Sequence, residues 1–119
     1  MLTKLAYIFG LVFLVIGVLG FVPAAAPGGM LFGFFHVNTA HNLVHLVTGA
    51  VAMAAAYQGV GYPKLFFQVF GVVYGVVALA GFWYGAMPIL GVVANNMADG
   101  VLHLVIAAAS LYLGFVYKE

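Results

Sequence analysis

HVNTAHNLVHLVTG, the stretch from His36 to Gly49, holds three of the four histidines of the chain. A related stretch, ANNMADGVLHLVIA, runs from Ala94 to Ala107. When the two are aligned, three pairs of polar residues correspond: Asn38 with Asn96, His41 with Asp99, and His45 with His103. These polar pairs lie in segments that are otherwise apolar, so any fold or function assigned to the chain must account for them.

The rest of the sequence is too apolar for a protein that is surrounded by water. Of its 119 residues, 67% are hydrophobic and 4% are charged, whereas a soluble domain carries roughly 25% charged residues. Lipid must therefore be the solvent for most of the chain. A backbone in lipid satisfies its hydrogen bonds only in helices or closed barrels. Because the apolar runs are continuous rather than alternating, we predict an all-α integral membrane protein.

Four apolar runs divide the sequence, and segments rich in proline and glycine separate them, as is typical of loops. The runs are Leu5–Val22, Met30–Tyr57, Leu65–Tyr84 and about Ile89–Tyr117. Each is long enough for a membrane-spanning helix, which needs about 17–25 residues. Short loops favour up-down-up-down packing, so we predict a four-helix transmembrane bundle that forms one domain over residues 1–119.

The two halves of the chain resemble each other beyond the polar pairs. Phe9–Val22 (FGLVFLVIGVLGFV) matches Phe70–Trp83 (FGVVYGVVALAGFW). We therefore predict two tandem two-helix repeats, the first over about residues 5–57 and the second over about residues 65–117. Because each repeat has two spans, both repeats enter the membrane from the same side and are related by an axis along the membrane normal.

The few charges predict an orientation. Lys4, Lys64 and Lys118 are the only cationic side chains apart from histidine, and four spans would place all three on one side. The positive-inside rule then puts both termini in the cytoplasm, and we expect a bacterial inner membrane. The lipid bilayer is the expected partner, and a homo-oligomer or a partner membrane subunit stays open. With no basic patch, we expect no binding of nucleic acid.

The polar residues follow a helical spacing. Residues three and four apart share one face of a helix, so Asn38, His41, His45 and Gly49 form one stripe. Asn96, Asp99, His103 and Ala107 form the other. The duplication suggests that the two stripes face each other inside the bundle. Ionisable side chains at such a depth are costly and usually mark a functional site.

A metal site is the preferred hypothesis for these stripes. His41, His45, Asp99 and His103 supply three imidazoles and one carboxylate, which suit zinc, copper, iron or manganese. The chain has no cysteine, so thiolate ligands are excluded. Asn38, Asn42 and Asn96 would orient the imidazoles by hydrogen bonds from outside the ligand set.

Three other interpretations stay open. The same residues could form a purely structural network of hydrogen bonds between helices, in a membrane scaffold or a partner subunit. His45 and His103 could be the two axial ligands of a haem, although no lysine or arginine lies near them to meet its propionates. A chain of Asp and His side chains could also carry protons or a small solute. Enzyme function is not favoured, because no nucleophile sits in a recognisable triad.

The polar motif also carries a family resemblance. With four spans and the residues Asn38, His41, Asn42 and His45, followed by Asn96, Asp99 and His103, the chain resembles an uncharacterised family of small bacterial four-helix membrane proteins. That family looks distantly similar to the DoxX-like group. The most specific part is HNLVHLVTG, His41–Gly49. The resemblance implies a four-span bundle with a cluster of Asn, His and Asp residues, and it implies no established activity.

Overall fold

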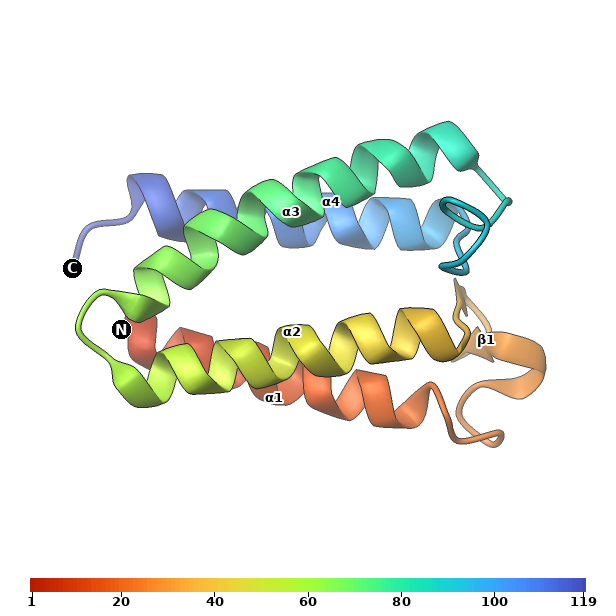
Figure 1. The fold of residues 1–119 in the computed structure, drawn as a ribbon, viewed down its shortest axis with the longest axis horizontal. Coiled ribbons are helices and arrows are strands. Elements are labelled where there is room, and N and C mark those ends of the chain that lie inside the picture. Colours follow the sequence, from red (N-terminus) through yellow and green to blue (C-terminus); the bar gives the residue numbers. More distant parts are fainter.

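The computed structural model describes all 119 residues and consists mostly of four helices (Figure 1). They are α1 (Leu2–Leu19), α2 (Thr39–Gln58), α3 (Tyr62–Tyr84) and α4 (Met97–Leu111), and a π-helical segment, Tyr112–Val116, continues α4. Helix α1 packs along α2 and α3 packs along α4, so the molecule consists of two helical hairpins that lie against each other.

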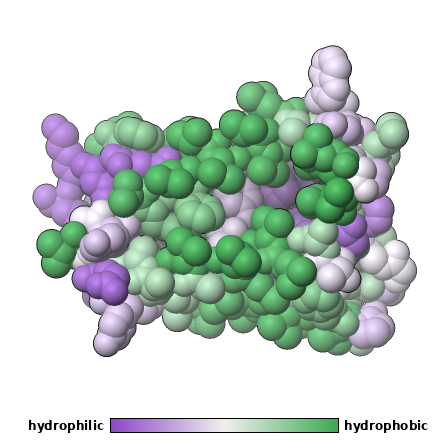
Figure 2. All heavy atoms as spheres, viewed as in Figure 1, coloured by the Kyte–Doolittle hydropathy of each residue, from purple (hydrophilic) through white to green (hydrophobic).

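Three helical segments are long and apolar enough to cross a membrane: α1, α3, and α4 with its extension to Val116. Helix α2 is not among them, because its first half carries the buried polar residues His41, Asn42, His45 and Thr48. The face of the molecule shown in Figure 2 is nonetheless mostly apolar between its two ends, and hydrophilic residues gather at those ends. This distribution is the one expected of a protein surrounded by lipid.

The second and fourth helices begin later than the sequence predicted. Expected spans started at Met30 and about Ile89, whereas α2 begins at Thr39 and α4 at Met97. Asn38 and Asn96 are therefore not part of the helical stripes but are the N-cap residues. Asparagine favours this position because its side-chain oxygen accepts a hydrogen bond from a backbone N–H group that the first turn leaves free.

Short irregular structure fills the segments ahead of these two caps. Before α2, a 3₁₀ turn (Pro27–Gly29) leads into the antiparallel pair β1 (Met30–Leu31) and β2 (Phe35–His36). Before α4, a single bridge joins Ile89 and Val93. Both segments lie at the same end of the molecule (Figure 1).

Within each hairpin, glycines let the helices approach closely. A Cβ atom on Gly49 of α2 would lie 2.8 Å from the backbone oxygen of Gly10 on α1. In the other hairpin, a Cβ atom on Gly114 would lie 2.6 Å from the backbone nitrogen of Gln68. No larger residue fits at such distances without moving a backbone, so the tight pairing within each hairpin depends on these glycines.

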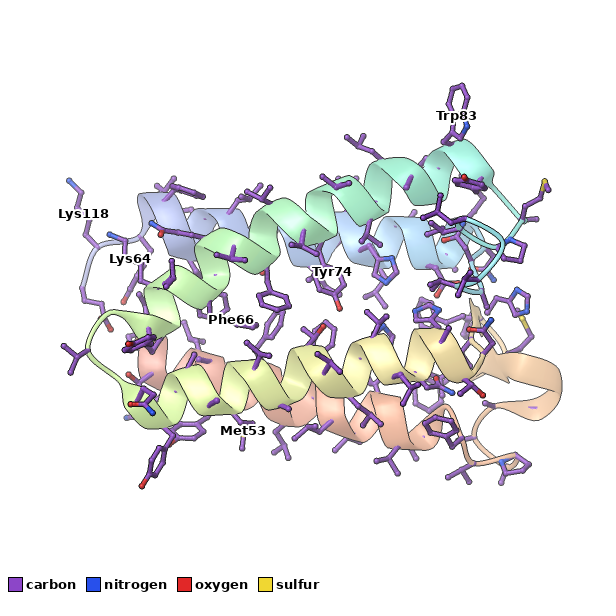
Figure 3. The ribbon with its side chains drawn as sticks, in the orientation of Figure 1. Met53, Lys64, Phe66, Tyr74, Trp83 and Lys118 are labelled. Carbon is purple, nitrogen blue, oxygen red and sulfur yellow. The ribbon has the colours of Figure 1, made fainter.

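Aromatic side chains fill the space between the two hairpins. Phe9 of α1 packs edge-on against Phe66 and Phe67 of α3, with ring centroids 5.5 and 5.6 Å apart. Phe13 and Tyr74 make a similar contact at 5.6 Å. Figure 3 shows Phe66 and Tyr74 directed from α3 toward the opposite hairpin. The buried histidines lie next to this aromatic layer, since His45 contacts Phe13 and His103 contacts Tyr74.

The two ends of the molecule differ in charge. Both termini and the α2–α3 turn lie at one end together with Lys64 and Lys118, while Trp83 lies at the other end (Figure 3). The N-terminal amino group pairs with Glu119 at 2.7 Å. Hydrogen bonding to the N-terminal ammonium group and to the Leu2 amide lowers the pKa of the Glu119 carboxyl group.

Candidate functional site: a buried group of three histidines

Three imidazoles converge between the hairpins. His41 and His45 lie one turn apart on α2, His103 comes from α4, and their exposed fractions are 2%, 4% and 3%. One nitrogen from each ring can be chosen such that all three lie within 4.8 Å of one another. A cavity of about 90 Å³ borders all three rings. Figure 2 shows hydrophilic atoms between the apolar surfaces of the two hairpins, nearer the end that carries the long loops.

The protonation of His41 is fixed by the backbone. Its Nδ1 atom lies 2.8 Å from the carbonyl oxygen of Ala94 and 3.1 Å from that of His36. A carbonyl oxygen can only accept, so Nδ1 carries the proton and donates it. The Nε2 atom of His41 therefore presents a lone pair to the other histidines. Metal-binding histidines are commonly held in this way, by a hydrogen bond from the nitrogen that does not bind the metal.

The distance between ring nitrogens is close to the distance expected between two ligands of one metal ion. Nε2 of His41 lies 3.1 Å from Nε2 of His45, and two nitrogens bound to one tetrahedral zinc ion at about 2.0–2.1 Å are roughly 3.3 Å apart. The ring centroid of His103 is 5.6 Å from that of His41 and 6.2 Å from that of His45. The His103 ring makes no hydrogen bond, and its Nδ1 atom is buried. Its nitrogens are therefore free to bind a ligand.

Asp99, the fourth predicted ligand, lies outside this group. Its Oδ2 atom accepts hydrogen bonds from the backbone amides of Asn96, at 3.0 Å, and His36, at 3.1 Å. With Asn96 it forms a capping box at the start of α4. The carboxylate reaches across to the other hairpin, as the predicted duplication suggested, but it meets the backbone of His36 rather than the ring of His41.

The three asparagines contact backbone groups or a glycine instead of the imidazoles. Asn38 accepts from the amide of His41 at 2.9 Å and donates to the carbonyl of Val92 at 2.9 Å. Asn96 likewise donates to the carbonyl of Phe34 at 2.9 Å. These bonds tie each long loop to the opposite hairpin.

The third residue, Asn42, packs against Gly20, which follows the last residue of α1, and its buried Oδ1 atom has no hydrogen-bond partner. Asn38 and Asn96 therefore position the start of α2 and of α4, and with them the histidines. None of the three asparagines orients an imidazole by a direct hydrogen bond.

Tyr74 is a site residue that the sequence analysis missed. It is 2% exposed, it borders the same cavity as the histidines, and its ring centroid lies 5.5 Å from that of His103. Its hydroxyl group is 2.9 Å from Oγ1 of Thr48. A tyrosine in the middle of an apolar run is the signal that could have identified it. The carbonyl groups that hold His41 carry no such signal, because every residue has one.

Comparison with known proteins gives a family but no activity. The chain belongs to the family described as Domain of unknown function (DUF4383), whose model matches residues 4–116. No curated protein and no solved structure matches the chain. The expected likeness to the DoxX-like group stays a prediction. Any function must therefore be inferred from the geometry of the site.

Proposed function

We propose that this member of the DUF4383 family is an integral membrane protein that binds one transition-metal ion through His41, His45 and His103. The convergence of the three buried imidazoles, with ligand atoms within 4.8 Å of one another, carries this proposal. The fixed proton on Nδ1 of His41 supports it, because a metal would meet a lone pair that is already in place. The set contains three of the four ligands predicted from the sequence, and Asp99 acts as a helix cap instead.

Zinc, copper and iron suit an imidazole site best, whereas manganese prefers carboxylate and water oxygens. Zinc sites with three protein ligands keep a fourth position for water or a small ligand. The adjoining cavity of about 90 Å³ has room for such a molecule, since a water occupies about 30 Å³ in the liquid. Such an ion would therefore be open to a small ligand rather than fully enclosed by protein.

Two of the other interpretations fit the geometry less well. A structural network satisfies its members, but Nδ1 of His45 and Nδ1 of His103 are both buried without a partner. Leaving such a group unpaired costs about 1–3 kcal/mol. A haem between His45 and His103 would need far more space than about 90 Å³, and the ring of His41 lies within 6 Å of both.

We also infer that the chain is a tandem duplication of about residues 5–57 and 65–117. The two N-cap residues support this, because Asn38 and Asn96 have the same backbone angles, φ −147° and ψ −177°. The loops ahead of them correspond as well, since Phe32 and Leu90 both have a φ of 54°. Each of the two asparagines also donates to a carbonyl group in the opposite loop.

The proposed orientation places the lysine-bearing end in the cytoplasm of a bacterial cell, with both termini there. Lys64 and Lys118 at one end, and Trp83 at the other, support a bilayer boundary at each end (Figure 3). The three histidines would then lie in the outer half of the membrane. A homo-oligomer or a partner membrane subunit remains compatible with the apolar surface.

Metal analysis of detergent-purified protein tests the proposal. We expect about one equivalent of zinc, copper or iron per chain, and a loss of most of it in His45→Ala and in His103→Ala. His36→Ala is the matched control, because it removes a histidine but leaves the carbonyl group that holds His41. Asp99→Asn should keep its metal.

Equal metal content in all five proteins, or none in the parent protein, would contradict the proposal. A loss in Asp99→Asn alone would show that the carboxylate, and not the histidine group, holds the ion. Gel filtration and a melting curve for each variant show whether it is folded. A Soret band in the purified parent protein would support haem instead.

A further inference from the structure

A groove on the lipid side of the molecule adjoins the cavity that borders the three histidines. The groove lies between α2 and α3 and has a volume of about 310 Å³, and Thr48 is its only lining residue without an aliphatic or aromatic side chain. The groove and the histidine cavity share Val44, Tyr74 and Val77. Val44 is 43% exposed, and Figure 2 shows hydrophilic atoms in the gap between the hairpins, on the face where α2 and α3 are nearest the viewer. The histidine cavity therefore borders the lipid-facing surface between α2 and α3.

The two long loops close the same site toward the water at their end of the molecule. The side-chain amide of Asn38 donates to the carbonyl of Val92, and that of Asn96 donates to the carbonyl of Phe34. Both loops also contact the ring of His41 through backbone carbonyl groups. A molecule that came from this water phase would have to break such bonds, whereas a molecule dissolved in the lipid would not.

We propose that a metal ion bound by the three histidines takes its remaining ligand from the bilayer, through the gap between α2 and α3, and that this ligand is an uncharged lipophile with a slender donor end. The inference rests on the proposed metal site. A charged ligand would lose its hydration among apolar walls, which is strongly unfavourable. The histidine cavity of about 90 Å³ is smaller than the roughly 150 Å³ that holds a benzene molecule. Only the donor end therefore fits beside the metal, and a hydrocarbon tail lies in the groove.

The metal ion itself cannot follow this route, because the groove offers an ion no polar ligands in place of its water. It would have to enter before the two loops close over the histidines. Loading of the protein with metal and binding of the ligand are therefore separate steps. For this reason the metal content and the binding of the ligand can be measured independently on one sample.

Two isocyanides test the class of ligand. Both bind copper(I) through their terminal carbon atom and have equal numbers of heavy atoms, but n-butyl isocyanide is uncharged, whereas isocyanoacetate carries a carboxylate. Each is added to copper(I)-loaded protein in lipid nanodiscs, and the infrared stretching band of the isocyanide group measures binding. Relative to a copper(I)–imidazole complex in water, we expect the protein to favour the uncharged isocyanide at least about tenfold, because the carboxylate has no partner in the groove.

Tryptophan variants test the route. Val44 and Val51 lie two turns apart on α2 and are 43% and 40% exposed, but Val44 lines both hollows and Val51 lines neither. Val44→Trp should slow the association of n-butyl isocyanide at least about tenfold, because the ligand has to displace the indole from a packed wall. Val51→Trp should keep the parent rate. Val73→Trp should also slow association, since Val73 lines the groove but not the histidine cavity.

The copper content of each sample separates the two proposals. If the parent protein holds copper(I) but shows no preference between the isocyanides, or if Val44→Trp and Val73→Trp both associate at the rate of Val51→Trp, the inference is wrong and the metal site stands. Parent protein that takes up no copper(I) would overturn the inference as well. The zinc content of the same protein then decides whether the metal site stands.

Discussion

At the scale of single residues, the contact between Tyr74 and Thr48 shows how the polar core is satisfied. The hydroxyl group of Thr48 donates to the carbonyl of Val44 at 2.8 Å, so the hydroxyl group of Tyr74 must be the donor in their 2.9 Å contact. The two residues are therefore not equivalent. Thr48 has a second partner, whereas Tyr74 depends on Thr48 alone.

We predict that Thr48→Val destabilises the protein more than Tyr74→Phe does. Tyr74→Phe removes one hydrogen bond and leaves Thr48 satisfied, which should cost about 0.6–1 kcal/mol. Thr48→Val leaves the Tyr74 hydroxyl buried without a partner, which should cost about 1–3 kcal/mol. Thermal unfolding of both variants in the same detergent shows which of them loses more stability. A larger loss for Tyr74→Phe would show that Tyr74 has a further role, such as a contact with a bound ligand.

At the scale of the helices, the hairpins depend on close crossings at glycine. Gly49 and Gly75 make a useful comparison, because both lie inside helices. A Cβ atom on Gly49 would lie 2.8 Å from a backbone oxygen, whereas one on Gly75 would meet nothing closer than the Cβ atom of Ala107 at 4.0 Å. The first position allows no side chain and the second has room for a methyl group.

We predict that Gly49→Ala lowers the stability of the protein by about 1–3 kcal/mol, the usual cost of overpacking. Gly75→Ala should be neutral or stabilising by up to about 1 kcal/mol, because alanine favours a helix more than glycine does. Melting temperatures in the same detergent compare the two. If both variants have the same melting temperature as the parent protein, the α1–α2 crossing can relax and Gly49 is not required there.

The helices also show where sequence reasoning reached its limit. Hydrophobic runs predicted four helices, because composition and length decide whether a segment can sit in lipid. They did not predict where α2 and α4 begin, since most of the residues before Asn38 and Asn96 are also apolar. The hydrogen bonds of these two side chains to backbone amides mark the start of each helix. The sequence alone does not indicate whether an asparagine within an apolar run is an N-cap residue or part of the helix.

At the scale of the whole molecule, the relative placement of the two hairpins decides the site. Spacing alone predicted that His41 and His45 share a face, because both lie on one helix. The predicted duplication suggested that the second stripe faces them, and His103 does join the group. Asp99 does not, because as the third residue of its helix it is close enough to cap it. Tyr74 comes from α3, for which the aligned stripes gave no information.

Because two of the proposed ligands lie on α2 and the third on α4, a bound metal would link one hairpin to the other. We therefore predict that zinc raises the melting temperature of chelator-treated protein. At a free concentration one hundred times the dissociation constant, binding contributes about 2.7 kcal/mol to stability. His36→Ala should show the full shift. His103→Ala keeps only the pair on one helix, which cannot connect the hairpins, so its shift should be small. An undiminished shift in His103→Ala would mean that the ion stabilises the protein from another site.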